Sequence, residues 1–233
     1  MDKHQKGIGS LNEHTLHLAL KNYIEPDSSF HECECEGFVV DIKRGDNIFE
    51  IETRSFSNEK KKLKKLLINN TVTIVYPIAE KKWVVWVDPK SGEISSKHKS
   101  PKKGRVCDVC YELYKIKSFI NNKNFRLKLI MAEVTEYKRR DGWSYDGKRG
   151  ATRIERIPEN IYRTIDLSSP KDYYMLADII PDGEFTAKEF SNLNKLKSRY
   201  AWYLIDILME AEIIERCGKE GRAYIYRKSE QLF

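Results

Sequence analysis

The sequence has no apolar run long enough to cross a bilayer, which excludes a helical membrane protein. Its opening residues, MDKHQKGIGS, contain no apolar signal region, so we expect a cytoplasmic location. Only five cysteines occur among 233 residues, and we expect reduced thiols rather than a disulfide framework. Glycine-rich phosphate loops, HExxH motifs and nucleophile elbows are also missing, so the common signatures of phosphate-loop enzymes, zinc peptidases and α/β-hydrolases do not apply.

Charged residues, by contrast, are plentiful. They make up 33% of the chain, against 40% hydrophobic residues, which is enough apolar material for a packed core and argues against global disorder. The formal net charge of +7 favours a polyanionic partner such as a nucleic acid.

The composition changes near Leu167-Ser168-Ser169-Pro170, and this change predicts two domains, residues 1–167 and 168–233. Helical and alternating patterns in the first part predict an α/β fold with a mixed sheet flanked by helices. The expected helices are Leu11–Tyr23, Ser57–Ile68 and Val106–Ile120, and the expected strands are Gly37–Lys43, Ile48–Thr53, Thr71–Pro77, Lys82–Asp88 and Phe125–Tyr137.

The segment GFVVDIKRGDNIFEIET predicts a β-hairpin that turns between Gly45 and Asp46. That register sets Asp41 opposite Glu50. Strand alternation then gives one apolar face and one acidic face, and the acidic face carries Asp41, Glu50 and Glu52.

Two facing carboxylates destabilise a sheet unless they lie in open water or a cation bridges them. Mg²⁺ suits this arrangement, with Mn²⁺ as a substitute, because it binds one or two carboxylates and completes its octahedron with water and phosphate oxygens. Asp41 and Glu50 are therefore the candidate metal ligands for phosphodiester hydrolysis. The alternative is that these carboxylates simply line a solvated sheet face.

An acidic residue that ends one strand, followed by Glu-x-Glu on the next, resembles the active site of the PD-(D/E)xK, restriction-endonuclease-like nuclease superfamily. The resemblance implies that Asp41 and Glu50 bind metal, that Glu13 on the preceding helix completes the site, and that Glu52 takes the slot usually held by a catalytic lysine. Some restriction endonucleases have a glutamate in that slot, and Lys43 is a candidate relocated lysine. FEIETRSF followed by TVTIVYPIAEKKWVVWV also resembles an uncharacterised bacterial family in which a nuclease-like domain precedes a winged helix.

The pair Cys107-x-x-Cys110 and the upstream Cys33-x-Cys35 could in principle supply four zinc ligands. The amphipathic pattern around Cys107 and Cys110 instead predicts two small buried side chains on one helix face. No second CxxC accompanies them, so we do not expect a zinc site.

Residues Lys138 to Arg156 form a basic stretch with interleaved aromatic side chains, which predicts a loop or hairpin able to contact phosphates and unpaired bases. A surface hairpin with an aromatic plug is the alternative. The candidate DNA-binding residues here are Arg139, Arg140, Trp143, Lys148 and Arg149.

Beyond residue 168 the pattern predicts three helices and a β-hairpin, with Thr186 and Glu189 as a capping box. This arrangement resembles a winged helix-turn-helix domain, which in DNA-binding members inserts its third helix into the major groove. The alternative is a winged helix used for dimerisation or domain docking. The candidate DNA contacts are Lys195, Lys197, Ser198 and Arg199, with Lys219 and Arg222 on the wing.

The leading hypothesis is thus a Mg²⁺-dependent DNA endonuclease that acts on duplex DNA as a homodimer, with restriction or anti-phage defence as the expected role. The second hypothesis is a non-catalytic DNA-binding regulator with a degenerate nuclease domain. The third is a protein-interaction module that makes no nucleic-acid contact.

Overall fold

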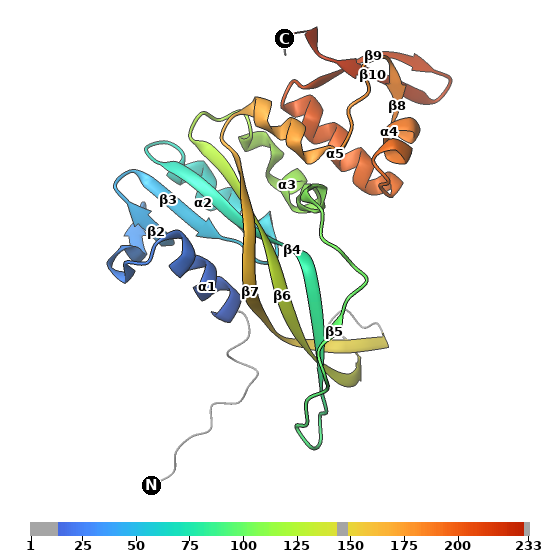
Figure 1. Cartoon of the computed structure of the whole chain (residues 1–233). Helices are drawn as coiled ribbons and strands as arrows, with labels where there is room; N and C mark the ends of the chain where they lie inside the picture. Colours follow the sequence, from blue (N-terminus) through green and yellow to red (C-terminus); the bar gives the residue numbers. More distant parts are fainter. Residues whose placement is uncertain (1–13, 144–148, 231–233) are drawn as a thin grey trace. The chain divides into compact units, whose positions relative to one another are not determined.

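The computed structural model describes residues 14–143 and 149–230 (Figure 1). No helix among these residues is long and apolar enough to span a membrane. The chain separates into two compact units. Unit 1 contains Met1–His31, Pro77–Arg105 and Ile130–Thr164, and unit 2 contains Glu32–Tyr76, Val106–Leu129 and Ile165–Phe233.

A seven-stranded mixed sheet organises the chain in the order β1-β2-β3-β4-β6-β7, with β5 paired to β4. The β2–β3 and β4–β5 pairs are antiparallel, whereas β3 and β4 are parallel. A mixed α/β sheet is therefore confirmed. The strands are β1 (His31–Cys35), β2 (Phe38–Arg44), β3 (Asn47–Ile51), β4 (Thr71–Val87), β5 (His98–Lys99), β6 (Phe125–Trp143) and β7 (Arg149–Leu167).

Short helices connect and flank these strands (Figure 1). The α-helices of this part are α1 (His14–Ile24), α2 (Glu59–Leu66) and α3 (Cys110–Leu113), and the 3-10 helices are η2 (Ser28–Phe30), η3 (Phe56–Asn58), η4 (Val106–Val109) and η5 (Tyr114–Phe119). Helix α2 is the crossover between the parallel strands β3 and β4, as parallel pairing requires.

The predicted β2–β3 register is confirmed by the pairs Ile42–Phe49, Lys43–Ile48 and Arg44–Asn47. Gly45 has a φ of +59°, a turn conformation that glycine adopts without steric cost. Val40, Ile42 and Ile51 are buried, as the apolar face requires. Ile48 is also fully buried. Because Ile48 alternates with Phe49, both faces of this hairpin are covered.

Two of the elements expected in the first part of the chain take a different form in the structure. The strands expected on either side of Ile78 are one continuous strand, β4, which passes through Pro77. The β3 ladder ends at the pair Ile51–Val75, so the missing N–H of Pro77 removes no bond to β3. The helix expected over Val106–Ile120 is broken into η4, α3 and η5, with non-helical backbone at Ile116.

Residues beyond 168 form a small α/β module within unit 2. Thr186 and Glu189 form the predicted capping box at the start of α4. The first expected helix is a 3-10 helix instead, and it begins at Pro170 directly after the capping Ser169. The elements are η6 (Pro170–Leu176), β8 (Phe185–Thr186), α4 (Ala187–Leu193), α5 (Ser198–Glu210), β9 (Ile214–Glu220) and β10 (Ala223–Lys228), and the strands pair in the order β8-β10-β9.

Candidate functional site

Unit 2 brings four carboxylates and one lysine together where β2, β3 and α2 meet. Asp41 belongs to β2, Glu50 to β3, Glu52 follows β3 directly, and Glu59 and Lys62 lie on α2. We call these five residues the acidic cluster. Charge interactions link Glu50 to Asp41, Glu59 and Lys62, so the acidic face is covered by α2 rather than open to water.

Asp41 lies where β2 and β3 stop pairing. The last paired residues are Ile42 and Phe49, and the Asp41 carboxylate then accepts a hydrogen bond from the backbone N–H of Ile51 at 2.7 Å. The predicted register therefore holds as far as the pair Ile42–Phe49. Asp41 and Glu50, which come next, do not form a ladder pair. This hydrogen bond fixes one Asp41 oxygen beside the next strand.

Glu50 is only 3% exposed, which rules out the solvated sheet face as an explanation for this carboxylate. The Lys62 Nζ lies 2.7 Å from Glu50 Oε2 and also donates to the carbonyl of Val39 at 2.8 Å. The other oxygen, Oε1, is buried and has no hydrogen-bond partner among the described residues. Burial raises the pKa of Glu50 to about 8, although the charge of Lys62 opposes the shift.

Glu52 and Glu59 form a hydrogen-bonded carboxyl pair beside Glu50. Burial raises the pKa of Glu52 to about 9, and the charge of Glu59, its hydrogen bond, and the charges of Asp41 and Glu50 add to the shift. Glu52 therefore holds a proton near neutral pH and can donate it to Glu59. The Oε2 atom of Glu59 is buried without a hydrogen-bond partner in the part of the chain that the structure describes.

The donor chemistry of the acidic cluster fits a hard divalent cation. Its candidate ligand atoms are carboxylate oxygens, and two of them are buried without a hydrogen-bond partner among the described residues. A bound cation would stabilise the ionised forms of Glu50 and Glu52, which burial and then the neighbouring carboxylates disfavour. No group of three or more histidine, cysteine, aspartate or glutamate side chains in residues 14–143 and 149–230 is arranged as a ready set of metal ligands. Mg²⁺ needs fewer, since one or two carboxylates with water and phosphate oxygens complete its shell.

Sequence reasoning did not find Lys62 or Glu59. Both belong to a lysine-rich helix, which typically presents a solvated face. The sequence did contain a signal for them, because residues 59, 62, 63 and 66 share one helix face with two leucines, a pattern that predicts an inward-facing stripe. In the structure Leu63 and Leu66 are fully buried. Lys43 donates instead to the carbonyl of Gly45 within the hairpin turn, at 2.5 Å. Glu13 lies outside the described residues.

The predicted DNA-binding residues lie in two places. In the β6–β7 hairpin, Arg139 is half-buried, Lys148 lies outside the described residues, and Arg140, Trp143 and Arg149 are described for their backbone alone. In the C-terminal module all six candidates are exposed, namely Lys195, Lys197, Ser198, Arg199, Lys219 and Arg222.

One face of α5 packs against α3 and η5. The Arg199 Nε donates to the Tyr203 hydroxyl at 2.7 Å, and its guanidinium lies 5.9 Å from the centre of the Tyr111 ring. Tyr203 lies 4.7 Å from the Tyr114 ring, measured between centroids, and Asp206 forms an ion pair with Lys117. This stripe along α5 therefore packs against α3 and η5 within unit 2.

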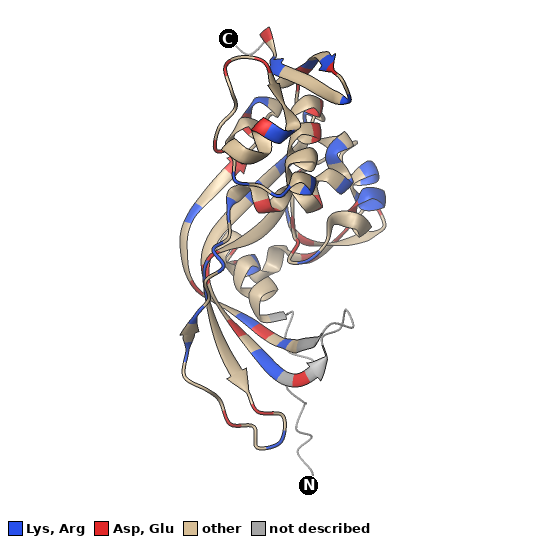
Figure 2. Cartoon of the chain, turned by 90° about the vertical axis from the view of Figure 1, so that its right-hand side faces the viewer, with Lys and Arg blue, Asp and Glu red and all other residues tan. Residues whose placement is uncertain are grey.

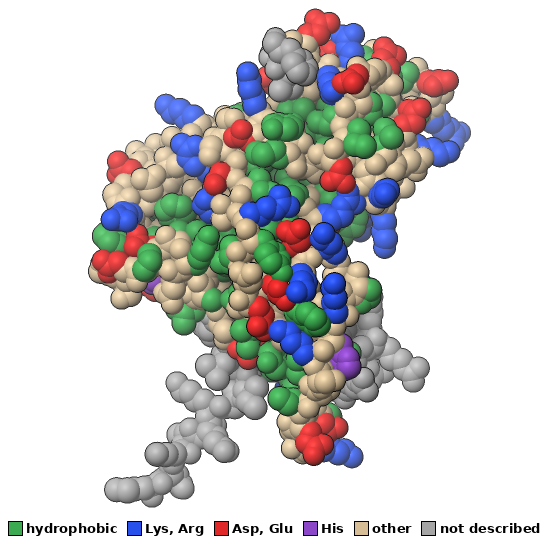
Figure 3. All heavy atoms as spheres, viewed as in Figure 1, with side chains coloured by type: hydrophobic (Ala, Val, Ile, Leu, Met, Phe, Trp, Pro, Cys, Tyr) green, Lys and Arg blue, Asp and Glu red, His purple; other side chains and the backbone are tan. Residues whose placement is uncertain are grey.

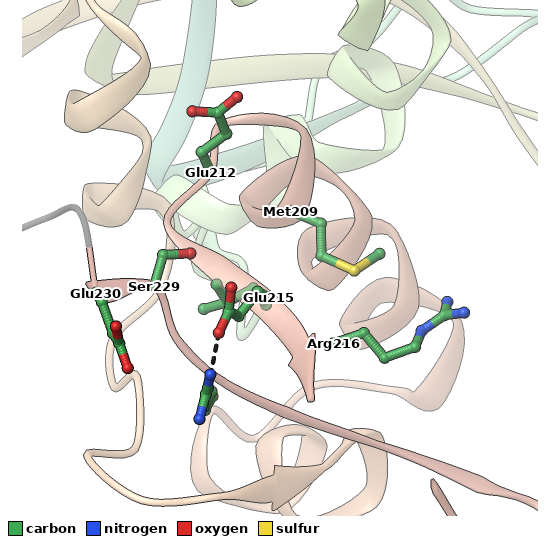
Figure 4. Close-up of a pocket in the computed structure, with 8 residues that line it drawn as sticks. Met209, Glu212, Glu215, Arg216, Ser229 and Glu230 are labelled. Atoms are coloured by element: carbon green, nitrogen blue, oxygen red, sulfur yellow. Dashed lines mark hydrogen bonds and ion pairs between the residues drawn. The ribbon is translucent and has the colours of Figure 1, made fainter. Parts of the chain in front are cut away.

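The end of the C-terminal module contains a hollow of about 530 Å³ between α5 and the β9–β10 hairpin (Figure 4). Three glutamates line it, and Glu215 pairs with Arg227 at 2.7 Å. Basic and acidic residues are interspersed along the described chain (Figure 2). The hollow therefore offers no excess of positive charge for a phosphate.

Cys107 and Cys110 are buried, as their amphipathic pattern predicted. Burial raises the pKa of the Cys110 thiol well above its ordinary value, so this thiol stays protonated and unreactive. Cys33 and Cys35 are half-buried on β1, and Cys217 is exposed.

A family model described as Domain of unknown function (DUF8091) matches residues 14–168, and the chain therefore belongs to that family. The chain is also similar to an uncharacterized protein of Treponema pallidum (strain Nichols), with 29% identity over 140 residues. That match covers 59% of this chain and 55% of the relative, so the chain spans about half of the relative's length. No solved structure matches the chain.

Proposed function

We propose that the protein is a Mg²⁺-dependent DNA endonuclease with its active site at the acidic cluster. The observation that carries the proposal is Glu50, a buried carboxylate with one unpartnered oxygen and a lysine 2.7 Å from the other. A structural ion pair would satisfy both oxygens, because an unpaired buried oxygen costs about 1–3 kcal/mol. A site that receives a ligand leaves one oxygen available.

The order of elements supports the same proposal. Helix α1, the β1–β2–β3 meander, the crossover helix α2 and the parallel strand β4 follow the helix–strand order expected from the resemblance to PD-(D/E)xK nucleases. Asp41 and Glu50 occupy the positions that the resemblance assigns to metal binding.

Within this proposal Asp41 and Glu50 would hold the cation, which when bound activates a water molecule and stabilises charge on the phosphodiester. Lys62 replaces Lys43 as the candidate lysine, because its ammonium group lies at Glu50 and can orient the attacking water. Glu52, in its ionised form, could accept the proton that the attacking water releases.

The C-terminal module is proposed as a winged helix, supported by its α4–α5 pair and its β8-β10-β9 sheet. Its exposed lysines and arginines would add affinity for duplex DNA by contacting phosphates. The α5 stripe that packs on α3 and η5 keeps Arg199 beside tyrosines, so Lys195 and Lys197 are the stronger candidates at this helix.

Plasmid cleavage tests the activity. Supercoiled DNA is incubated with the protein and Mg²⁺ or Mn²⁺, and nicked and linear products are followed on gels. We expect cleavage by the wild type and none by Asp41→Ala or Glu50→Ala, while Asp46→Ala in the adjacent turn serves as the matched control. Linear product at the earliest times indicates a homodimer with two active sites, whereas nicked circles that accumulate first indicate a monomer.

If the wild type binds DNA but cleaves none with either cation, the non-catalytic regulator replaces the endonuclease. If Asp46→Ala loses cleavage together with the cluster variants, the acidic cluster is not the site.

A further inference from the structure

A basic strap, residues 97–105, runs along β4 in unit 1 and carries positive charge that the acidic cluster does not use. Two pairs, Trp83–Lys99 and Val84–His98, join β5 to β4. The backbone N–H groups of Ser100 and Gly104 continue the attachment by donating to Lys82 O and Ala79 O, each at 2.8 Å. The strap is therefore fixed at both ends.

A pocket of about 760 Å³ opens beside this strap. Its volume falls within the roughly 300–1,000 Å³ typical of ligand sites, and it exceeds what a single inorganic ion needs. Six basic side chains line the pocket, namely Lys81, Lys82, Lys99, Lys102, Lys103 and Arg163. Over β4 and β5, blue and red side chains lie close together on the face that Figure 3 presents.

Part of this positive charge is already neutralised, and part is not. Lys81 pairs with Glu133 at 2.9 Å and Lys82 with Glu136 at 3.3 Å. Glu80 is the single carboxylate in the lining, and its oxygens lie 3.8 Å from Lys103 and 3.7 Å from Arg163, beyond hydrogen-bond distance.

Lys99 and Lys102 have no carboxylate within ion-pair distance among the described residues, and both are exposed. Together with Lys103 and Arg163 they leave the pocket with an excess of positive charge. An anion with several phosphates would match it better than a single carboxylate, because phosphate offers more acceptor oxygens to lysine and arginine.

An aromatic ring completes the pocket. Tyr162 is 43% exposed, and its hydroxyl donates to Glu133, a carboxylate that also accepts from Trp83 Nε1. The hydroxyl end of the ring is thus held by Glu133, while the residue remains partly exposed. Base stacking on such a ring contributes about 1–3 kcal/mol per base, which is what distinguishes a nucleic-acid site from a general polyanion site.

We propose that this pocket binds a single strand of DNA, with backbone phosphates at Lys99, Lys102, Lys103 and Arg163 and an unpaired base on Tyr162. The choice of DNA as the polyanion rests on the proposed function. The pocket itself stands on its own residues, none of which belongs to the acidic cluster.

Fluorescence anisotropy with a labelled single-stranded oligonucleotide tests the proposal in EDTA, where no cleavage occurs. The variants are Lys99→Glu/Lys102→Glu and, as a control with the same change in net charge, Lys90→Glu/Lys123→Glu, both of whose lysines are exposed and lie outside the pocket lining. We expect the affinity of the pocket variant to fall about tenfold or more, and the slope of its log binding constant against log salt concentration to be smaller by about two. The affinity of the control variant should stay within about twofold of the wild-type value.

Tyr162→Ser provides the second arm. We expect it to weaken binding of the single strand and to leave binding of a hairpin duplex unchanged. Equal losses in the pocket and control variants overturn the proposal, as does a Tyr162→Ser variant that binds the single strand like the wild type. The anisotropy measurements do not depend on cleavage. A negative plasmid assay therefore contradicts the endonuclease proposal without contradicting binding of the single strand at the pocket.

Discussion

At the scale of single residues, the charge of Glu50 depends on its burial, on Lys62 and on whether a cation is bound. With a pKa of about 8, the Glu50 carboxyl is mostly protonated at neutral pH, and Glu52, with a pKa of about 9, is protonated as well. A divalent cation favours the ionised carboxylates, so binding must release protons. Cation affinity at the acidic cluster is therefore expected to rise with pH.

The same shifts set the pH dependence of folding. Both folded-state pKa values lie above the ordinary glutamate value of 4.5, so the stabilisation from these groups is fully present below about pH 4.5 and is lost as pH rises through about 8 to 9. We expect Mg²⁺ to raise the melting temperature little at about pH 6 and clearly more at about pH 8.5. Thermal unfolding followed by circular dichroism, with Mg²⁺ or with EDTA, measures this difference.

Glu50→Gln is the control for that experiment, because the amide is similar in shape and cannot ionise. The metal-free variant should melt above the wild type at both pH values, and the difference should be larger at the higher one. Its response to Mg²⁺ should be small at both. A Mg²⁺ shift that is the same at both pH values in the wild type contradicts proton-linked binding at this carboxylate.

Lys62 is the second residue whose role can be isolated. Replacement by methionine keeps the aliphatic length and removes the ammonium group, so Lys62→Met should slow plasmid cleavage about a hundredfold or more while DNA binding in EDTA stays near the wild-type value. Lys60→Met, at an exposed position of the same helix, is the matched control. A comparison with Lys43→Met then decides between the two candidate lysines. If Lys43→Met lowers the cleavage rate more than Lys62→Met does, Lys43 is the lysine that acts at the site.

At the scale of elements, the attachment of the basic strap depends on a glycine. An ideal Cβ on Gly104 would lie 2.6 Å from Ala79 O and 2.8 Å from Ile78 Cγ2, closer than any side chain tolerates. Gly104→Val should therefore detach this end of the strap, destabilise the fold by about 1–3 kcal/mol, and weaken oligonucleotide binding without changing any charge. Anisotropy and thermal unfolding are measured together, with Gly183→Val, whose Cβ meets nothing within 4 Å, as the control.

Elements with strong local signals were predictable from sequence. The β2–β3 register followed from the turn at Gly45 and from strand alternation, and the α4 capping box followed from Thr186 and Glu189. Features that depend on a distant neighbour were not. Pro77 lies inside β4 because β3 has already ended beside it, and Lys62 turns inward because α2 covers the acidic strands.

At the scale of the molecule, the chain divides into two compact units, each built from separated segments, and the domain boundary at residue 168 stays a prediction. The family match ends at residue 168, yet the C-terminal residues from 165 onward form one compact unit with 32–76 and 106–129. The contacts explain this grouping. Lys117 forms an ion pair with Asp206, and Asn121 donates to the Glu210 carbonyl at 2.7 Å.

A chain that ends at residue 167 tests which description holds. Truncation removes α5 and exposes Tyr111 and Tyr114, which now pack against Tyr203. If the C-terminal module is part of the unit, the shortened chain should melt at a lower temperature, unfold over a broader range and bind more of a hydrophobic dye than the full chain. If it is an independent domain, the melting temperature of residues 1–167 should be unchanged.

The matched variant for this comparison keeps the whole chain and weakens the α5 contact alone. Asp206→Ala together with Tyr203→Ala removes the ion pair with Lys117 and the ring against Tyr114, while the buried α5 residues Leu204 and Leu208 stay in place. Because the module's own core is retained, a melting temperature that falls toward that of the truncated chain attributes the loss to docking. A variant that melts like the wild type, beside a truncated chain that does not, would instead show that the rest of the module supplies the stability.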